Sequence, residues 1–239
     1  MSGHSKWAKL KHFKGAIDAK KSSLFTKIAQ MITVAVRQGG GDPANNFKLR
    51  LAIDKAKRAN MPKENVQRAI DRGLGKTNES IIESALYEVF FPGKIAFLIE
   101  VLTDNKNRTM GELRRIINQY DGNFAQPGAV LWMFEKKGII RINKSKILNR
   151  QEFELKTIDL GADDIKEEED ELAIYTSPEN LEKVKDGIEK DGVEIDYAEI
   201  EWFAKDPITI SEQEQKKINE IFAKLDEIEE VNDYYTNIK

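Results

Sequence analysis

Residues 86–103 read LYEVFFPGKIAFLIEVLT, and this stretch sets the architecture at the centre of the chain. Two apolar runs, Leu86–Phe91 and Ile95–Thr103, are rich in β-branched and aromatic residues, which favour strands. Pro92 and Gly93 lie between the runs and favour a tight turn. The stretch therefore predicts a β-hairpin. A two-stranded hairpin is at best marginally stable alone, so its partners must come from elsewhere in the chain.

The segments that follow the hairpin supply only part of a domain. Asn107–Tyr120 has the pattern of a helix, and Ala129–Phe134 has the pattern of a strand. The resulting order, β-β-α-β, lacks one helix and one strand. The end of the chain offers both, as an amphipathic helix at 211–228 and a strand at Val231–Tyr235. We therefore expect a discontinuous middle α/β domain formed by residues 81–134 and 205–239.

The region between these two pieces predicts a complete domain of its own. Residues 138–204 show the order β-α-β-β-α-β, which is the split ferredoxin-like arrangement. The expected elements are an extended segment at 138–142, a helix at about 149–160, strands near 163–168 and 171–176, a helix begun by Ser177-Pro178, and a strand at 194–204. We expect residues 135–204 to form an inserted ferredoxin-like α/β domain.

The first 80 residues predict a small helical domain. Apolar side chains recur at helical spacing between residues 22 and 37, and Gly39-Gly40-Gly41 ends that helix. Asp42-Pro43 has the composition of a second helix start, and Pro62 that of a third. The expected fold class is therefore α+β, with an N-terminal helical bundle and two α/β domains.

Charge is divided unevenly along the 239 residues. Residues 1–75 hold 16 Lys and Arg against 5 Asp and Glu, whereas residues 76–239 hold 22 against 36. The formal net charge of −3 therefore hides a strongly basic module on an acidic body. Such a module favours an anionic partner. We expect residues 1–80 to be a basic domain that binds DNA or RNA.

Several side chains of the basic domain are candidates for that contact. Basic residues interleaved with aromatic ones can neutralise phosphates and stack on exposed bases, although a solvated helix face also carries many charges. The expected phosphate contacts are Lys6, Lys9, Lys11, Lys14, Lys20, Lys21, Lys27 and Arg37, and the expected stacking or hydrogen-bonding groups are Trp7 and His12.

Arg108 is a further candidate outside the basic domain. It lies in Thr103–Thr109, between a predicted strand and a predicted helix. Asn107 or Thr109 could cap that helix. A cation near a helix N-terminus is disfavoured unless an anion or an acidic side chain pairs with it, so Arg108 joins the predicted nucleic-acid contacts.

Other kinds of site find little support. Arg72-Gly73-Leu74-Gly75-Lys76-Thr77 resembles part of a P-loop, but Ile70 stands where that motif needs glycine. His4 and His12 have no carboxylate cluster beside them, so zinc is not expected. The chain has no Cys and no activated serine motif. We expect no enzyme activity, cofactor or small-molecule ligand.

Composition also bears on location. The absence of Cys suits a reducing compartment, and no apolar run approaches the roughly 20 residues of a membrane span. The first residues lack an apolar signal region and are Lys-rich rather than Arg-rich. We expect a cytoplasmic protein without a membrane partner.

The assembled motifs resemble the YebC/PmpR family. The residues that carry the resemblance are Gly3-His4-Ser5-Lys6-Trp7, Lys11-His12, Gly39-Gly40-Gly41-Asp42-Pro43, Asn60-Met61-Pro62-Lys63, Tyr87-Glu88, Pro92-Gly93, Leu102–Thr109 and the ending Val231–Asn237. The resemblance implies three domains, with a helical bundle first and a discontinuous middle domain. The chain departs from the family pattern at Phe90–Lys94, Gly128-Ala129 and Tyr235-Thr236-Asn237.

Two functions agree with the resemblance. The family includes probable DNA-binding transcriptional regulators, and this is the function that we expect. Other members, such as the mitochondrial translational activator of cytochrome oxidase, act on the ribosome, so the alternative is a ribosome-associated translation factor that binds ribosomal RNA. A metal-dependent nuclease is a third possibility, but it needs clustered carboxylates, and the five acids of the basic domain are spread along it.

Overall fold

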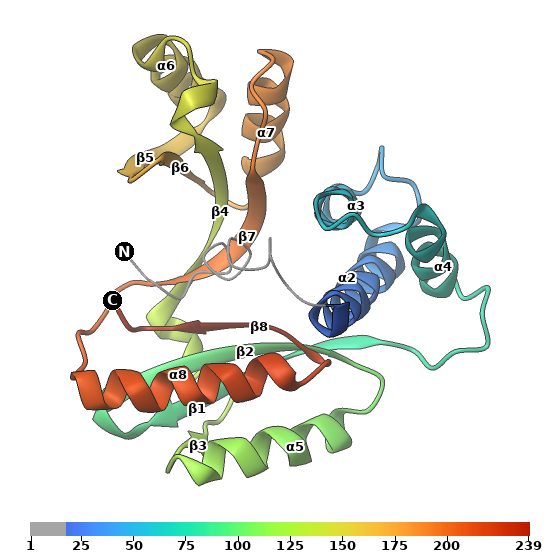
Figure 1. Ribbon diagram of the computed structural model, residues 1–239, viewed down its shortest axis with the longest axis vertical. Helices are drawn as coiled ribbons and strands as arrows, with labels where there is room; N and C mark the ends of the chain where they lie inside the picture. Colours follow the sequence, from blue (N-terminus) through green and yellow to red (C-terminus); the bar gives the residue numbers. More distant parts are fainter. Residues whose placement is uncertain (1–17) are drawn as a thin grey trace. The chain divides into compact units, whose positions relative to one another are not determined.

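The computed structural model describes residues 18–239, which form two compact units (Figure 1). The first unit contains the described residues up to Met133 together with Ala204–Lys239, and the second is Phe134–Phe203. Among the helices described, each is too short or too polar to cross a membrane.

Three helices form the bundle of the first unit: α2 (Asp18–Gly39), α3 (Phe47–Arg58) and α4 (Lys63–Gly73). Their apolar faces meet in a shared core, in which Ile28, Ile32 and Leu49 are fully buried. The predicted apolar face of α2 is therefore the face that packs.

Helix α3 begins four residues later than Asp42-Pro43, so that predicted start is wrong. Asn46 caps the helix by accepting a hydrogen bond from the Leu49 N–H at 3.1 Å. Its side-chain amide also donates to the carbonyls of Ala35 and Gly40, both at 2.8 Å. Asp42 instead accepts from the Ala44 N–H and so stabilises the preceding turn. One buried Asn thus joins the end of α2 to the start of α3.

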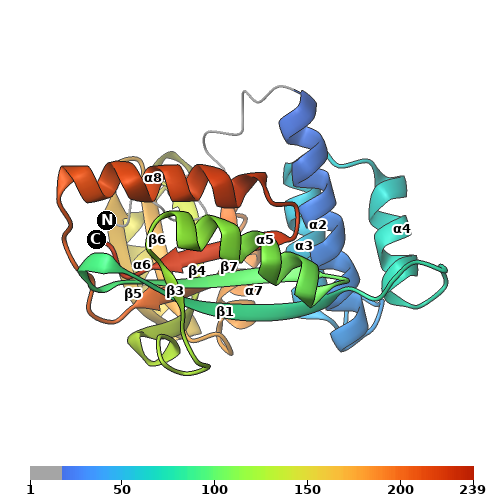
Figure 2. The same ribbon diagram turned by 90° about the horizontal axis from the view of Figure 1, so that it is seen from below.

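The middle sheet has the strand order β3-β1-β2-β8. Its strands are β1 (Glu83–Phe91), β2 (Ile95–Thr103), β3 (Asn123–Phe124) and β8 (Val231–Thr236), and a short turn, η2 (Pro92–Lys94), joins β1 to β2 as predicted. Helices α5 (Lys106–Gln119) and α8 (Glu212–Glu227) share one apolar core with this sheet (Figure 2). The end of the chain therefore completes the middle sheet, as the sequence predicted.

The strand predicted at Ala129–Phe134 does not form, and the two-residue β3 takes its place in the sheet. Residues 129–133 form turns and a 3₁₀ segment, η3 (Leu131–Met133). The cause is Glu88, whose carboxylate accepts from the N–H groups of Gly128 (2.5 Å), Val130 (2.6 Å) and Leu131 (2.8 Å). Because these donors point at one carboxylate, they are not available to a neighbouring strand.

The second unit is ferredoxin-like. Its elements are β4 (Phe134–Asn143), η4 (Lys144–Lys146), α6 (Arg150–Leu160), β5 (Ala162–Glu168), β6 (Glu171–Thr176), α7 (Leu181–Lys190) and β7 (Tyr197–Ala204). The strand order β5-β6-β4-β7 is the order of that fold. Helix α7 begins at Leu181, after a turn at Ser177-Pro178. The predicted α+β class, with a bundle and two α/β parts, is confirmed.

The pairing of β2 with β8 gives a first testable prediction. An isolated fragment of residues 81–134 lacks β8 and α8, so one edge of β2 and one face of the core are exposed in it. We expect no cooperative thermal unfolding from this fragment and a cooperative transition from residues 138–204. Circular dichroism melts of both fragments check this. A cooperative melt of the 81–134 fragment would contradict the dependence on β8.

The buried carboxylate of Glu88 gives a second testable prediction. Burial favours the neutral acid, but the three backbone N–H groups outweigh burial and lower the pKa of Glu88. Its stabilising contribution is therefore complete above the unfolded pKa of about 4.3 and is lost as the pH falls through the folded pKa.

We expect Glu88→Gln to reduce the free energy of unfolding by roughly 1–3 kcal/mol at pH 7. The difference between wild type and variant should be smaller at pH 3–4, because this range lies below the unfolded pKa of about 4.3 and the unfolded wild-type chain is then favoured by binding a proton. Denaturant titrations at both pH values measure it. The exposed Glu112, which lies on α5, provides a control in Glu112→Gln. A difference that does not change with pH would rule out this account.

Candidate nucleic-acid interface

Most of the predicted contacts in the basic domain precede the described part of the chain. Lys6, Trp7, Lys9, Lys11, His12 and Lys14 lie outside the described residues. Lys20, Lys21, Lys27 and Arg37 belong to α2, and Arg108 lies in the first turn of α5.

Lys21 and Arg37 are exposed at opposite ends of α2. Sixteen residues separate them, which corresponds to about 24 Å of helix. The structure therefore does not bring these two predicted contacts together.

Lys27 is directed toward the middle domain. Its ammonium donates to the carbonyl of Asp226, at the C-terminal end of α8, at 3.2 Å. Burial lowers the pKa of Lys27, and the carboxylates of Asp226, Asp233 and Glu229 oppose that shift. A lysine held in this way ties α2 to α8, and its predicted phosphate contact would require it to leave that position.

Arg108 is paired with acidic side chains. Its guanidinium contacts Glu230 at 2.6 Å and Asp104 at 2.8 Å. The hydrogen bonds that Arg108 donates to Glu230 and to Asp104 raise the pKa of Arg108. These partners account for a cation at the start of α5, and its contact with nucleic acid stays a prediction.

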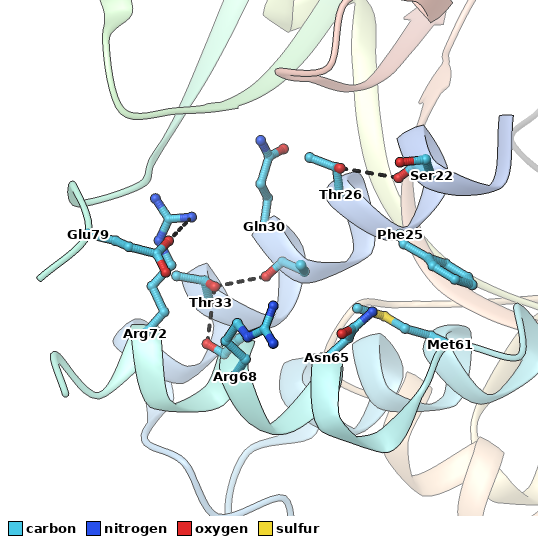
Figure 3. Close-up of a pocket in the computed structure, with 12 residues that line it drawn as sticks. Ser22, Phe25, Thr26, Gln30, Thr33, Met61, Asn65, Arg68, Arg72 and Glu79 are labelled. Atoms are coloured by element: carbon cyan, nitrogen blue, oxygen red, sulfur yellow. Dashed lines mark hydrogen bonds and ion pairs between the residues drawn. The ribbon is translucent and has the colours of Figure 1, made fainter. Parts of the chain in front are cut away.

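A groove runs between α2 and α4, with a volume of about 320 Å³ (Figure 3). Its lining combines apolar, amide, hydroxyl and charged side chains. The lining residues are Ser22, Phe25, Thr26, Ala29, Gln30, Thr33, Met61, Asn65, Arg68, Ala69, Arg72 and Glu79.

Helices α2 and α4 are in direct contact at Thr33, which also lines the groove. The Thr33 hydroxyl lies 2.8 Å from the Ala29 carbonyl and 3.1 Å from the Ala69 carbonyl, so it links α2 to α4. Gly73 allows this approach, because a Cβ at that position would lie 2.7 Å from the Thr33 carbonyl oxygen. Gly73, the last residue of α4, is therefore a packing residue.

The groove carries polar groups whose bonding capacity is not used within residues 18–239. The amide oxygen of Gln30 and the Nε of Arg72 are buried without a hydrogen-bond partner there. Arg72 uses its other nitrogens to bind Glu79 at 2.8 Å and the Ser80 carbonyl at 2.9 Å. Arg68 is exposed, and no acid in the described part of the chain pairs with it. The groove can therefore offer one cation and several hydrogen-bonding groups to an anionic ligand.

Sequence reasoning missed Arg68 and two other cations of the bundle, Arg58 and Lys63. Arg58 and Lys63 are exposed, and within residues 18–239 neither of them forms an ion pair. The sequence could show only that these three cations belong to the basic domain. It does not show which basic residues lack acidic partners. In the described part of the chain, no group of three or more His, Asp or Glu could hold a metal ion.

Known proteins share the whole of this architecture. Family models described as the TACO1/YebC N-terminal domain and the TACO1/YebC second and third domain match residues 5–76 and 82–238. A "Probable transcriptional regulatory protein" of Pseudothermotoga lettingae is 44% identical over 239 residues, which cover 100% of this chain and 94% of that protein. A protein of the same description from Thermoanaerobacter pseudethanolicus is also 44% identical and is covered to 97%.

A solved structure agrees with the sequence comparisons. The crystal structure of a conserved hypothetical protein from Aquifex aeolicus matches with a TM-score of 0.86 and 38% identity. The match covers 98% of this chain and 97% of the other.

The contact at Gly73 can be tested by adding one methyl group. Gly73→Ala gains helix propensity of about 1 kcal/mol, but its Cβ would overlap the Thr33 carbonyl and Val36. We expect a net loss of about 1–3 kcal/mol in the free energy of unfolding. Denaturant titration measures it.

Gly111→Ala is the matched control. Gly111 lies in α5, and a Cβ there would meet nothing within 4 Å. We expect this variant to gain about 0.4–1 kcal/mol. Equal effects at the two positions would show that close helix packing does not decide the outcome at Gly73.

Proposed function

The chain belongs to the TACO1/YebC family, and we propose that it is a DNA-binding transcriptional regulator whose basic N-terminal domain contacts the nucleic acid. The relatives named as probable transcriptional regulatory proteins support a regulatory role. The contact with nucleic acid is our inference from charge.

The observation that carries the proposal is the concentration of basic charge in one domain. Residues 1–75 hold 16 of the 38 Lys and Arg but only 5 of the 41 Asp and Glu. In the described part of the bundle, Arg58, Lys63 and Arg68 are exposed and make no ion pair with an acid. Basic charge of this kind supplies most of the affinity of non-specific nucleic-acid binding.

The proposal includes how and where the protein acts. We infer that it works by binding rather than by catalysis, and in the cytoplasm. The alternative is a ribosome-associated translation factor that uses the same basic surface on ribosomal RNA. Crosslinking in cells, followed by sequencing of the bound nucleic acid, separates the two: promoter DNA supports the first, ribosomal RNA supports the second, and recovery of neither contradicts both.

The lysines before α2 provide the test in vitro. We expect replacement of Lys6, Lys9, Lys11 and Lys14 by alanine to weaken binding to every sequence. Each lost phosphate contact should reduce the slope of log affinity against log salt by roughly one unit. Trp7→Ala should weaken binding by about 1–3 kcal/mol and leave the slope unchanged, if the indole stacks on a base. Fluorescence anisotropy at several salt concentrations measures both.

Four lysines of the acidic body give the matched control. Lys183, Lys190, Lys216 and Lys217 are exposed and lie outside the basic domain. Their replacement by alanine should change affinity and salt slope little. If residues 81–239 alone bind as tightly as the full chain, the basic domain is not the binding site. Turnover of labelled DNA or RNA with Mg²⁺ would contradict the non-catalytic proposal.

A further inference from the structure

We propose that the groove between α2 and α4 holds one unpaired nucleotide of a single-stranded segment. This inference rests on the proposed function and adds to it the state of the nucleic acid that is recognised. The four supporting features are the size of the groove, its apolar wall, its unused hydrogen-bonding groups and its cation.

The size of the groove suits one nucleotide. Its volume of about 320 Å³ lies at the small end of the roughly 300–1,000 Å³ found for small-molecule sites. A base inside a duplex cannot enter, since its faces and its pairing edge are covered by neighbouring bases. An unpaired base can be turned outward and inserted.

The wall of the groove offers an aromatic ring. Phe25 lines the groove from α2 and is partly exposed, and Met61 lines it from the segment that precedes α4 (Figure 3). Unpaired bases are commonly stacked on aromatic side chains. This stacking tolerates any base, because every base has a π-face.

Amide groups can bind the edge of the same base. Gln30 on α2 and Asn65 on α4 line the groove from two different helices (Figure 3). The amide oxygen of Gln30 is buried and has no donor within residues 18–239. An acceptor left in this state is costly, and a turn of the Gln30 side chain into the groove would let an exocyclic amine or ring N–H of a base satisfy it. A phosphate alone would not, because it brings acceptors only.

Arg68 provides the charge that a nucleotide needs. Its guanidinium lies on the α4 side of the groove and, within residues 18–239, has no acidic partner (Figure 3). Arg72 in the same groove is already bound to Glu79. Arg68 is therefore the residue that contacts the phosphate, and the guanidinium fork can bind two of its oxygens.

Binding of full-length protein to three labelled probes tests this assignment. The probes are oligo(U), oligo(dT) and a duplex, each of about 12 nucleotides or base pairs, which lies within the site sizes of single-strand binders. We expect both single strands to bind at least about five-fold more tightly than the duplex. A difference between oligo(U) and oligo(dT) would show which sugar the groove prefers.

Variants then locate the binding site. Phe25→Leu keeps an apolar side chain but removes the ring, and Arg68→Gln removes only the charge. We expect each to weaken single-strand binding by about five-fold or more, the lower limit for one stacked base. Arg114→Gln removes the same charge from an exposed position of α5, outside the basic domain, and should change affinity less than two-fold. Thermal melts show whether each variant is folded.

Photocrosslinking of the wild-type protein to 4-thiouridine RNA keeps the test valid if a variant unfolds. Crosslinks are expected on peptides that contain Phe25 or Asn65. If the strands bind but the groove variants behave like Arg114→Gln, or if all crosslinks fall elsewhere, the groove is not the site while the proposed function stands. If the full-length protein binds no probe at all, the proposed function fails as well.

Discussion

The close approach of α2 and α4 determines the shape of the bundle. At one end, Thr33 lies 3.1 Å from the Ala69 carbonyl, and Gly73 has no side chain that could hold the helices apart. At the other end, Phe25 and Asn65 line open space instead of filling it. The same packing that stabilises the bundle therefore leaves a groove in it. Helices separated evenly along their length would leave no such groove, since side chains would fill the gap throughout.

Much of the fold could be predicted from local pattern. The hairpin at Leu86–Thr103 was marked by two apolar runs around a Pro-Gly turn. The helix and strand that the middle domain lacked could then be found at the end of the sequence. The prediction of a strand at Ala129–Phe134 was wrong because of a hydrogen-bonding partner that lies far away in the sequence. Glu88, about forty residues earlier in the chain, binds the N–H groups of that segment. An apolar run predicts burial, and only tertiary hydrogen bonds decide between strand and turn.

The candidate site was less predictable than the fold. Composition identifies a basic domain, but it does not show which cations are free. Lys27 binds the carbonyl of Asp226 and Arg108 binds Glu230, so each depends on a residue more than one hundred positions away. Arg68 has no acidic partner within residues 18–239, and its sequence context does not distinguish it from its neighbours. The groove arises only when residues 22–33 and 61–72 pack together.

The pairing of β2 with β8 also orders events during synthesis. Thr103 ends β2, whereas Val231 begins the strand that covers its open edge. At roughly 5–20 residues per second, the chain between them takes about 6–26 s to emerge. The inserted ferredoxin-like unit is complete before that interval ends. Until β8 is synthesised, however, one edge of β2 has no partner strand, and an unpaired edge is the part of a sheet most prone to aggregate. A nascent chain of this protein is therefore vulnerable until β8 has emerged, and a product truncated before Val231 is the form that most needs a chaperone.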